Sequence, residues 1–303
     1  MFNLARIRRI ILPLVCFLLC FSSLTMAETA KPAPWWKTDM ISAIGHGFPP
    51  DHAENLGQAK IFAKQAAMLD AYRHLAEQAA GIHITATQTM TEAKIKAIIT
   101  GAKITKEEYD EHGNCSIVLS VPIYGVESSF AQAAIKPATK KNFPEPNKKL
   151  SAAIPVEGNY TGLIIDCDEA LAEEDDDENE TEDLNPVLLP TVLSSDNKVI
   201  YSLDNLDREK VVAGGMITYS EKSDLERQIE RVGHNPLIVK ATKLTNDNST
   251  PILSAVDTAK ILSENRASHF LDNCAVVMLS TKGPRDSIGM GTRSKRKFSD
   301  GRV

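Results

Sequence analysis

The residue types best suited to chemistry are scattered along the chain rather than grouped. Gly45-His46-Gly47 stands between a predicted strand and a predicted helix, where phosphate-binding loops place glycines, but no third glycine opens the helix. None of the seven histidines has another at an i, i+2 or i+4 spacing, as a metal site would favour; they are His46, His52, His74, His83, His112, His234 and His269. We therefore interpret the glycine step as a tight turn, and we expect no catalytic residue, no cofactor and no metal.

The first residues have the three-part pattern of a secretory signal. Arg6, Arg8 and Arg9 precede an apolar run over residues 10–24, and small residues then surround a possible cleavage site after Ala27. The alternative is a transmembrane anchor, but the run is shorter than the roughly 20 apolar residues that span a bilayer. The sequence therefore predicts a signal peptide over residues 1–27 and an exported protein, in the periplasm, at the outer membrane or secreted.

The net charge, and the residues that precede Cys16 and Cys20, limit which partners and attachments are expected. Removal of residues 1–27 takes away three arginines and no acids, so the formal charge changes from −6 to −9. A net acidic chain argues against nucleic acid as a partner. A lipoprotein signal needs a small residue before its cysteine, whereas Val15 precedes Cys16 and Leu19 precedes Cys20. Lipid attachment is therefore the less favoured outcome.

Three cysteines remain after cleavage: Cys115, Cys167 and Cys274. Cys167 follows a predicted strand at 160–166, and Cys274 opens another at 274–280. If these strands are antiparallel neighbours, the cysteines meet; if they are parallel neighbours, the cysteines lie at opposite edges of the sheet and cannot bond. We predict a Cys167–Cys274 disulfide in an oxidising compartment, and the alternative is three free buried thiols.

The first domain is predicted at residues 38–134, with a long helix over 56–80 between a strand at 40–44 and a strand at 82–86. A short helix at 91–100 and a hairpin of two strands around residues 110–114 follow. Recurrence at three- and four-residue steps predicts the buried helix face: Ala59, Phe62, Ala66, Leu69, Tyr72, Ala76 and Ala79. The expected class is α+β, with an antiparallel sheet and one long helix of β-α-β-β-β type.

The rest of the chain divides by composition. Residues 135–158 contain four prolines and five lysines and are predicted to be a linker. A second, mixed α/β domain is predicted at 159–281. It contains an acidic insert at 168–183 with eleven Asp or Glu residues, which should be disordered because like charges repel. Residues 282–303 form a basic tail, predicted to be disordered, that could touch a membrane surface.

The helix of the first domain resembles that of a known bacterial family. Its signature comprises Gln58, Ala59, Ala66, Asp70, Ala71, Arg73, Leu75 and Glu77. With the later Gly113-Asn114 and Leu119-Ser120-Val121-Pro122, this signature is similar to the twenty-kilodalton outer-membrane lipoprotein family and to the N-terminal domain of flagellar assembly protein T. Two segments of the second half, 162–167 and 270–277, also look like the second half of longer members. The resemblance implies a non-enzymatic protein of the periplasm or outer membrane.

Together these features predict a cell-envelope protein that acts through protein–protein contacts as a structural or assembly component. Its partners would be envelope proteins or further copies of itself. The alternative is a ligand-binding module with a pocket between the two domains, for a small molecule that the sequence does not identify. An enzyme is the third hypothesis, and fold resemblance by itself does not decide among them.

Overall fold

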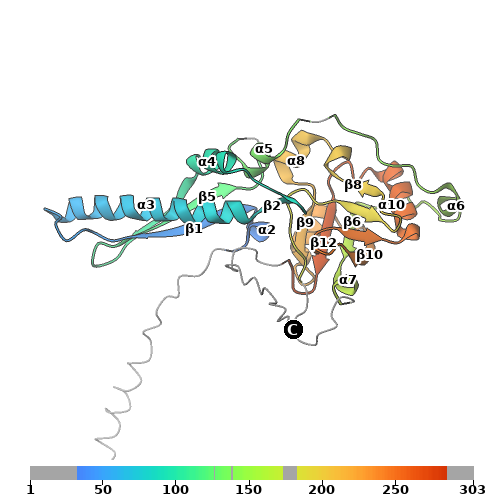
Figure 1. Ribbon diagram of the computed structural model, residues 1–303. Coiled ribbons are helices and arrows are strands. Elements are labelled where there is room, and N and C mark those ends of the chain that lie inside the picture. Colours follow the sequence, from blue (N-terminus) through green and yellow to red (C-terminus); the bar gives the residue numbers. More distant parts are fainter. Residues whose placement is uncertain (1–32, 126, 138, 173–182, 285–303) are drawn as a thin grey trace, which may run out of the picture. The chain divides into compact units, whose positions relative to one another are not determined.

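The computed structural model describes residues 33–125, 127–137, 139–172 and 183–284 (Figure 1). The predicted α+β class is confirmed, with one antiparallel sheet in the N-terminal region and a mixed sheet in the C-terminal region. The predicted signal peptide and its cleavage site at Ala27 lie outside the described residues, as do 173–182 of the acidic insert and 285–303 of the basic tail. Within the described residues, no helix combines the length and apolarity that crossing a membrane requires.

The N-terminal region is a three-stranded sheet with a long helix across one face (Figure 1). Its elements are α2 (Trp35–Thr38), β1 (Met40–Gly47), α3 (Leu56–Gly81), β2 (His83–Thr85), β3 (Gln88–Thr89), α4 (Glu92–Thr100), β4 (Lys103–Tyr109), β5 (Cys115–Pro122) and α5 (Phe130–Ala134). The strand order is β1-β5-β4, antiparallel throughout, and β4 and β5 form the predicted hairpin. Alternate residues of β5 are buried because they face α3.

The buried face of α3 overlaps the predicted one only in part: Ala79 is buried as predicted, and Tyr72 and Ala76 pack half-buried against the core. The helix spans nearly the predicted residues, but its buried residues are Ala63, Ala67, Ala71, Leu75 and Ala79. Leu69 and Phe62, predicted to be buried, are exposed. Alanines at four-residue steps let the helix backbone approach β1 closely, and this close packing, not the size of the apolar side chains, decides which face is inside.

The strand predicted at 82–86 is also placed differently. It forms β2 over three residues, and it pairs with β3 in a separate two-stranded sheet instead of joining the β1-β5-β4 sheet. β2 is also hydrogen-bonded to the C-terminal region, since Leu188 N donates to His83 O at 2.9 Å and Leu189 N donates to Ile84 O at 2.7 Å. These long-range bonds leave no local trace in the sequence.

The C-terminal region is a seven-stranded sheet in the order β8-β7-β11-β10-β6-β12-β9. Its elements are β6 (Gly162–Asp166), α7 (Asp168–Ala172), β7 (Val192–Ser194), β8 (Val199–Tyr201), the 3-10 helix η1 (Leu203–Asn205), α8 (Arg208–Gly214), β9 (Thr218–Glu221), α9 (Leu225–Val232), β10 (Pro236–Leu244), β11 (Pro251–Leu253), α10 (Ala255–Ser268) and β12 (Val276–Ser280). The four strands β10, β6, β12 and β9 are mutually parallel, while the β10–β11 and β7–β8 pairs are antiparallel.

Helices cover both faces of the parallel part of this sheet. Ile164 of β6 and Val277 of β12 share a small buried cluster with Val232 of α9. The neighbouring β6 residues, Leu163 and Ile165, belong to the larger cluster that includes the α10 residues Ile261 and Leu262. Fully buried strands of this kind have continuous rather than alternating apolar sequences, as the predicted strand at 160–166 does.

The predicted linker is fastened along the C-terminal region. It contains a short helix, α6 (Lys148–Ser151). Before it, the Arg208 guanidinium donates to Ile135 O at 2.9 Å, and Phe143 stacks on Tyr201 with ring centroids 6.4 Å apart. The proline and lysine content of 135–158 predicts exposure, but it carries no information about these attachments.

The acidic insert begins with ordered structure. Residues 168–172, predicted to be disordered, form α7, and Ala170 is buried. Lys240 pairs with Glu169, and Lys222 pairs with Asp168. The positive charges of Lys222 and Lys240 therefore neutralise the first acidic residues of the insert. Counting acidic residues along the sequence does not reveal these partners.

Candidate functional site

The predicted disulfide is wrong. β6 and β12 pair in parallel, with Leu163 opposite Val276, so Cys167 follows the carboxyl end of β6 whereas Cys274 precedes the amino end of β12. A strand rises roughly 3.3 Å per residue, so the two cysteines lie too far apart for a bridge, which needs Cα atoms within about 7 Å. Cys115, Cys167 and Cys274 are all free and buried, as in the alternative interpretation. Burial raises the pKa of each thiol, which keeps it protonated and unreactive.

Two side chains of α3 cover the open edge of β1. Asp70 Oδ2 accepts a hydrogen bond from His46 N at 3.0 Å, and His74 Nδ1 donates to Ile44 O at 2.9 Å. These backbone groups point away from β5, because β1 is an edge strand. Asp70 thus occupies edge positions that a foreign strand would otherwise use.

The next signature residues fix how closely α3 lies on β1. Ala71 and Leu75 are fully buried. A Cβ atom added at Gly45 would overlap Ala67 O, and one added at Gly47 would overlap Ala63 O. The predicted tight turn at Gly45-His46-Gly47 is therefore the end of a regular strand, and its glycines are required by contact with the helix rather than by a bound phosphate.

The remaining signature residues support the helix itself. Gln58 Oε1 accepts from Glu54 N at 2.7 Å, while Gln58 N donates to the cap residue Asn55 at 2.9 Å. Arg73 donates to Asp70 at 2.8 Å, and this bond holds the pKa of Asp70 below its ordinary value. Glu77 lies 3.9 Å from Arg73. Ala59 is half-buried and Ala66 is exposed, so the signature contains residues of both helix faces.

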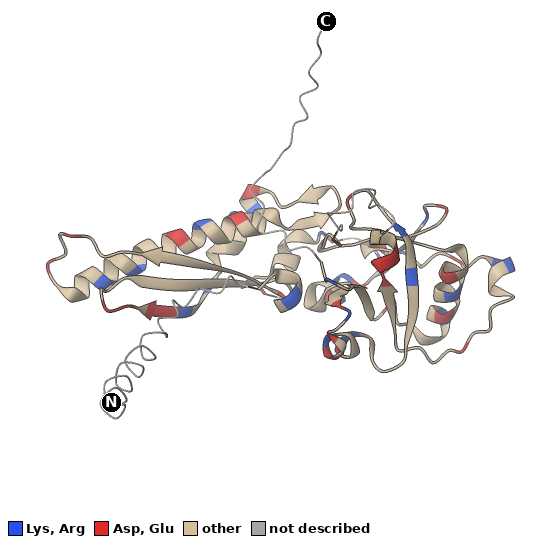
Figure 2. Cartoon of the chain, turned by 90° about the horizontal axis from the view of Figure 1, so that it is seen from below, with Lys and Arg blue, Asp and Glu red and all other residues tan. Residues whose placement is uncertain are grey.

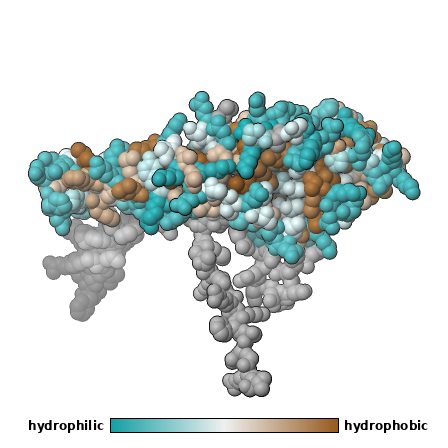
Figure 3. All heavy atoms as spheres, turned by 45° about the horizontal axis from the view of Figure 1, so that its top comes forward, coloured by the Kyte–Doolittle hydropathy of each residue, from teal (hydrophilic) through white to brown (hydrophobic). Residues whose placement is uncertain are grey.

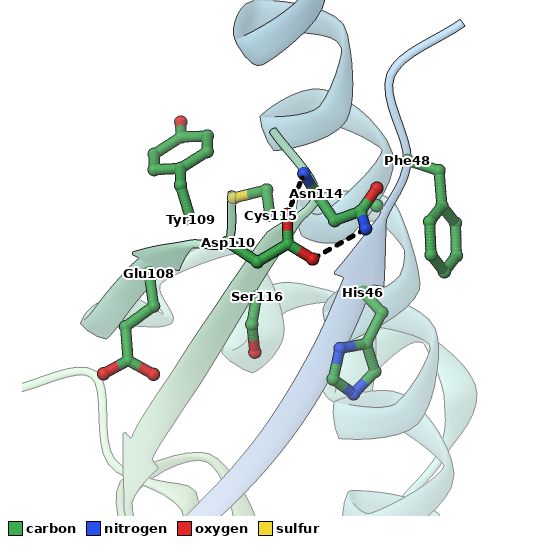
Figure 4. Close-up of a pocket in the computed structure, with 9 residues that line it drawn as sticks. His46, Phe48, Glu108, Tyr109, Asp110, Asn114, Cys115 and Ser116 are labelled. Carbon is green, nitrogen blue, oxygen red and sulfur yellow. Dashed lines mark hydrogen bonds between the residues drawn. The ribbon is translucent and has the colours of Figure 1, made fainter. Parts of the chain in front are cut away.

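A first cavity of about 510 Å³ lies at the end of the N-terminal sheet (Figure 4). Asp110 lines it, but Asp110 Oδ1 accepts from His112 N at 2.8 Å and from Asn114 N at 2.9 Å. Asp110 Oδ2 accepts from Asn114 Nδ2 at 2.7 Å, as Figure 4 shows. The carboxylate is used to close the β4–β5 turn, so it offers little to a ligand.

His46 and Cys115 line the same cavity but do not form a reactive pair. In the β1–β5 ladder, Cys115 is opposite Gly47 and His46 is opposite Ser116, so the two side chains lie on opposite faces of the sheet. Tyr109, next to Cys115, donates to Glu107 at 3.0 Å. Burial, together with this bond, raises the pKa of Tyr109 to about 12. The geometry provides no activated nucleophile here.

A cluster of charged side chains lies at the carboxyl ends of the parallel strands. Lys222, after β9, pairs with Asp168 and lies 2.8 Å from Asp166 at the end of β6. Thr281, after β12, donates to Asp168 from both its N–H and its hydroxyl. Burial by itself would raise the pKa of Asp168, but the bonds from Lys222 and Thr281 lower it below its ordinary value. The bonds to Asp166 and Asp168 raise the pKa of Lys222 to about 12.

This cluster links the carboxyl ends of three strands, β6, β9 and β12, through ion pairs and hydrogen bonds. Its charges are paired with one another, and among the described residues no group of His, Cys, Asp and Glu side chains has a metal-binding arrangement. Ligands of parallel sheets often bind at this edge, but the carboxylates here are already engaged. Sequence reasoning missed Asp166 and Lys222, since only the strand order brings them together.

A second cavity, of about 650 Å³, lies where the N-terminal β2–β3 ribbon meets the C-terminal region. Thr85 and Gln88 line it from the ribbon, and Thr191 and Ser202 line it from the C-terminal region. Lys141 and Asp204 also line it, and their charges pair with each other at 2.6 Å. A lining of amides, hydroxyls, aliphatic side chains and one ion pair suits a polar ligand without net charge. A third cavity, of about 300 Å³, adjoins the predicted linker and shares Pro144 with the second.

Glu264 is a further residue that the sequence analysis missed. Its side chain is fully buried in α10. Its two carboxylate oxygens accept from Glu157 N and Gly158 N, both at 2.8 Å. A buried carboxylate without such bonds would be costly, so Glu264 secures the end of the predicted linker to the C-terminal region. A lone Glu within a helix carries no signal of this role.

Residues 162–282 are similar to a known family, the second domain of Tp0624 from Treponema pallidum. The matched segment begins at β6 and ends just after β12, so it contains all seven strands of the C-terminal sheet. It covers less than half of the chain and does not include α3 or the N-terminal sheet. No curated protein matches the chain.

Proposed function

We propose that this protein is a non-enzymatic component of the bacterial cell envelope that acts through protein–protein contacts in a structure or assembly. One observation carries the proposal. Among the described residues, seven of the thirteen exposed large apolar side chains lie in the N-terminal region, and four of those seven are on α3. Phe62 and Leu69 lie on one side of this helix, and exposed apolar patches are typical of sites that contact other macromolecules.

Three further features support this proposal. The signal pattern over residues 1–27 favours export to the periplasm, the outer membrane or the medium. The α3 signature resembles the twenty-kilodalton outer-membrane lipoprotein family and flagellar assembly protein T, which suggests a related assembly role. The acidic charge of the exported chain disfavours nucleic acid, and Figure 2 shows charges of both signs interspersed along α3.

Cross-linking in intact cells tests the proposal. The tagged chain should be recovered from the envelope fraction in a discrete cross-linked complex of fixed composition. A matched variant with Leu69→Arg, which places a charge on the exposed apolar surface, should lose that complex while keeping its export and its helix content. A chain that stays in the cytoplasm, or that gives only uncross-linked monomer in the envelope, would contradict the proposal.

A second candidate function is ligand binding at the cavity of about 650 Å³ between the β2–β3 ribbon and the C-terminal region. A neutral, polar small molecule there would bridge both regions and raise the melting temperature of the whole chain. A thermal-shift panel of neutral saccharides and short peptides tests this. A Gln88→Ala and Thr191→Ala double variant should abolish any shift, and a shift that survives in that variant would place binding elsewhere.

A further inference from the structure

The third cavity, of about 300 Å³, is bounded by three segments that are distant in the sequence. Helix α10 forms one wall, the β7–β8 hairpin forms a second, and residues 144–150 of the predicted linker, which we call the roof segment, form the third. Helices α6 and α10 lie at the right of Figure 1, and Figure 3 shows brown atoms among teal ones over that part of the surface. A cavity of this volume is within the range that holds small molecules.

Aliphatic side chains line this cavity from all three segments. Ile200 of β8 and the α10 residues Ala259 and Leu262 are almost fully buried. Pro144 and Leu150 add apolar surface from the roof segment. An apolar ring or a short aliphatic chain is therefore stabilised when it leaves water for this space.

The charged side chains that line the cavity are already paired. Asp196 lies 2.6 Å from Lys198 Nζ within the β7–β8 hairpin. Glu145 of the roof segment pairs with Arg266 of α10. A charged group that enters the cavity would lose its hydration without gaining a free partner of opposite sign, so the cavity favours a molecule without charge.

One hydroxyl group at the cavity lacks a partner. Thr258 of α10 lines the cavity, and its Oγ1 atom is buried and has no hydrogen-bond partner among the described residues. Threonine hydroxyls inside helices commonly bond the carbonyl oxygen four residues earlier, but that of Thr258 does not. Buried polar groups in folded proteins nearly always have partners, so this hydroxyl indicates where a bound molecule can supply one.

We propose that the third cavity binds a small uncharged molecule that has an apolar ring or short aliphatic chain and one hydroxyl group. The hydroxyl group bonds to Thr258, and the apolar part packs between Leu262 and Leu150. The bound molecule thus contacts both α10 and the roof segment and holds them together. This inference goes beyond the proposed assembly function and concerns a different cavity from the second candidate function.

A matched pair of probes tests the proposal, because p-cresol and toluene differ by one hydroxyl group. Their binding to the purified protein is measured by saturation-transfer nuclear magnetic resonance, which detects weak ligands. Wild type should bind p-cresol more tightly than toluene. Thr258→Val, which keeps the shape of the side chain, should weaken p-cresol binding by about fivefold and leave toluene binding unchanged.

A blocking variant locates the binding. Ala255→Trp places a large ring at an exposed residue that lines the cavity, and it should abolish binding of both probes. Val256→Trp is the control, because Val256 is the next residue of α10 and is also exposed (54%) but does not line the cavity. The Gln88→Ala and Thr191→Ala double variant, which alters the second cavity, should also bind as wild type does. Circular dichroism verifies that each variant folds.

Limited digestion with trypsin tests the contact with the roof segment. Lys148 and Lys149 are exposed in α6, next to Leu150. Saturating p-cresol should slow cleavage after these lysines severalfold in wild type, because the bound molecule holds the roof segment on α10. The cleavage rate of Ala255→Trp should not respond to p-cresol.

Three results would overturn the inference: a wild-type protein that binds neither probe at about 1 mM, binding that persists in Ala255→Trp, or a Thr258→Val variant in which both probes weaken equally. None of these results bears on the proposed assembly function, which is tested by cross-linking in cells. Loss of the cross-linked complex would likewise leave the ligand site intact, so the two proposals fail separately.

Discussion

The two regions of the molecule pack a helix on a sheet in opposite ways. In the N-terminal region, alanines of α3 meet the glycines of β1, so backbone contacts backbone and little apolar area is buried per residue. In the C-terminal region, valines, leucines and isoleucines fill the space between the sheet and its helices. On this helix Phe62 and Leu69 face outward, while Leu75 is buried and Tyr72 packs half-buried against the core. The C-terminal region uses its bulky residues internally.

The largest expected effect tests the close contact in the N-terminal region. Gly47→Ala adds a methyl group that overlaps Ala63 O, a backbone atom that cannot rotate away. We expect a loss of about 3 kcal/mol in the free energy of unfolding, measured by urea denaturation. Gly101→Ala is the control, because the added atom there makes only ordinary van der Waals contacts. A Gly47→Ala protein as stable as wild type would show that the helix can lift from the sheet without cost.

The next largest expected loss of stability follows from removal of a buried carboxylate in the C-terminal region. Glu264→Ala removes the acceptors of Glu157 N and Gly158 N, and we expect a loss of about 2–4 kcal/mol because these donors are left unpaired. Glu264→Gln, which retains one acceptor, should lose less. Glu226→Ala, on the exposed side of α9, should change the stability by less than about 0.5 kcal/mol. Equal effects at positions 264 and 226 would contradict the assigned role.

The reactivity of the buried thiols allows a comparison of the two regions. Cys115 lies in the N-terminal region, and Cys167 and Cys274 lie in the C-terminal region. Because burial raises the pKa of each thiol, an alkylating reagent at about pH 8 should modify none of them rapidly in the folded protein. All three should react after unfolding without reductant, as read by mass spectrometry. Recovery of a linked Cys167–Cys274 peptide would contradict the parallel pairing of β6 and β12.

The smallest expected effect concerns the edge of β1. The pKa of Asp70 is lowered in the folded state by Arg73 and by His46 N, so its contribution is present above its unfolded pKa near 3.8 and is lost as the pH falls below that value. Asp70→Asn should cost about 1 kcal/mol at neutral pH. The difference from wild type should narrow in acid, as measured by thermal unfolding at several pH values. A constant difference would mean that the charge of Asp70 is not involved.

Local features of the sequence determined the elements. The extent of α3, the turn at residues 110–114 and the cap at Ser254, whose hydroxyl accepts from Asp257 N, follow from short-range spacing and capping chemistry. The fold class followed from the order of those elements. These signals are readable because the interactions behind them join residues only a few positions apart.

Tertiary structure decided which face of α3 is buried, that β6 and β12 pair in parallel, and that β2 pairs with β3 outside the three-stranded sheet. Both sides of α3 carry apolar residues, so periodicity could not say which side meets the sheet; the glycines at positions 45 and 47 decided it, because they admit only a helix that presents alanine. Apolar content likewise shows that β6 and β12 are buried but not that they run parallel. Strand direction and the convergence of Asp166, Asp168 and Lys222 arise from contacts between distant segments, which no local pattern encodes.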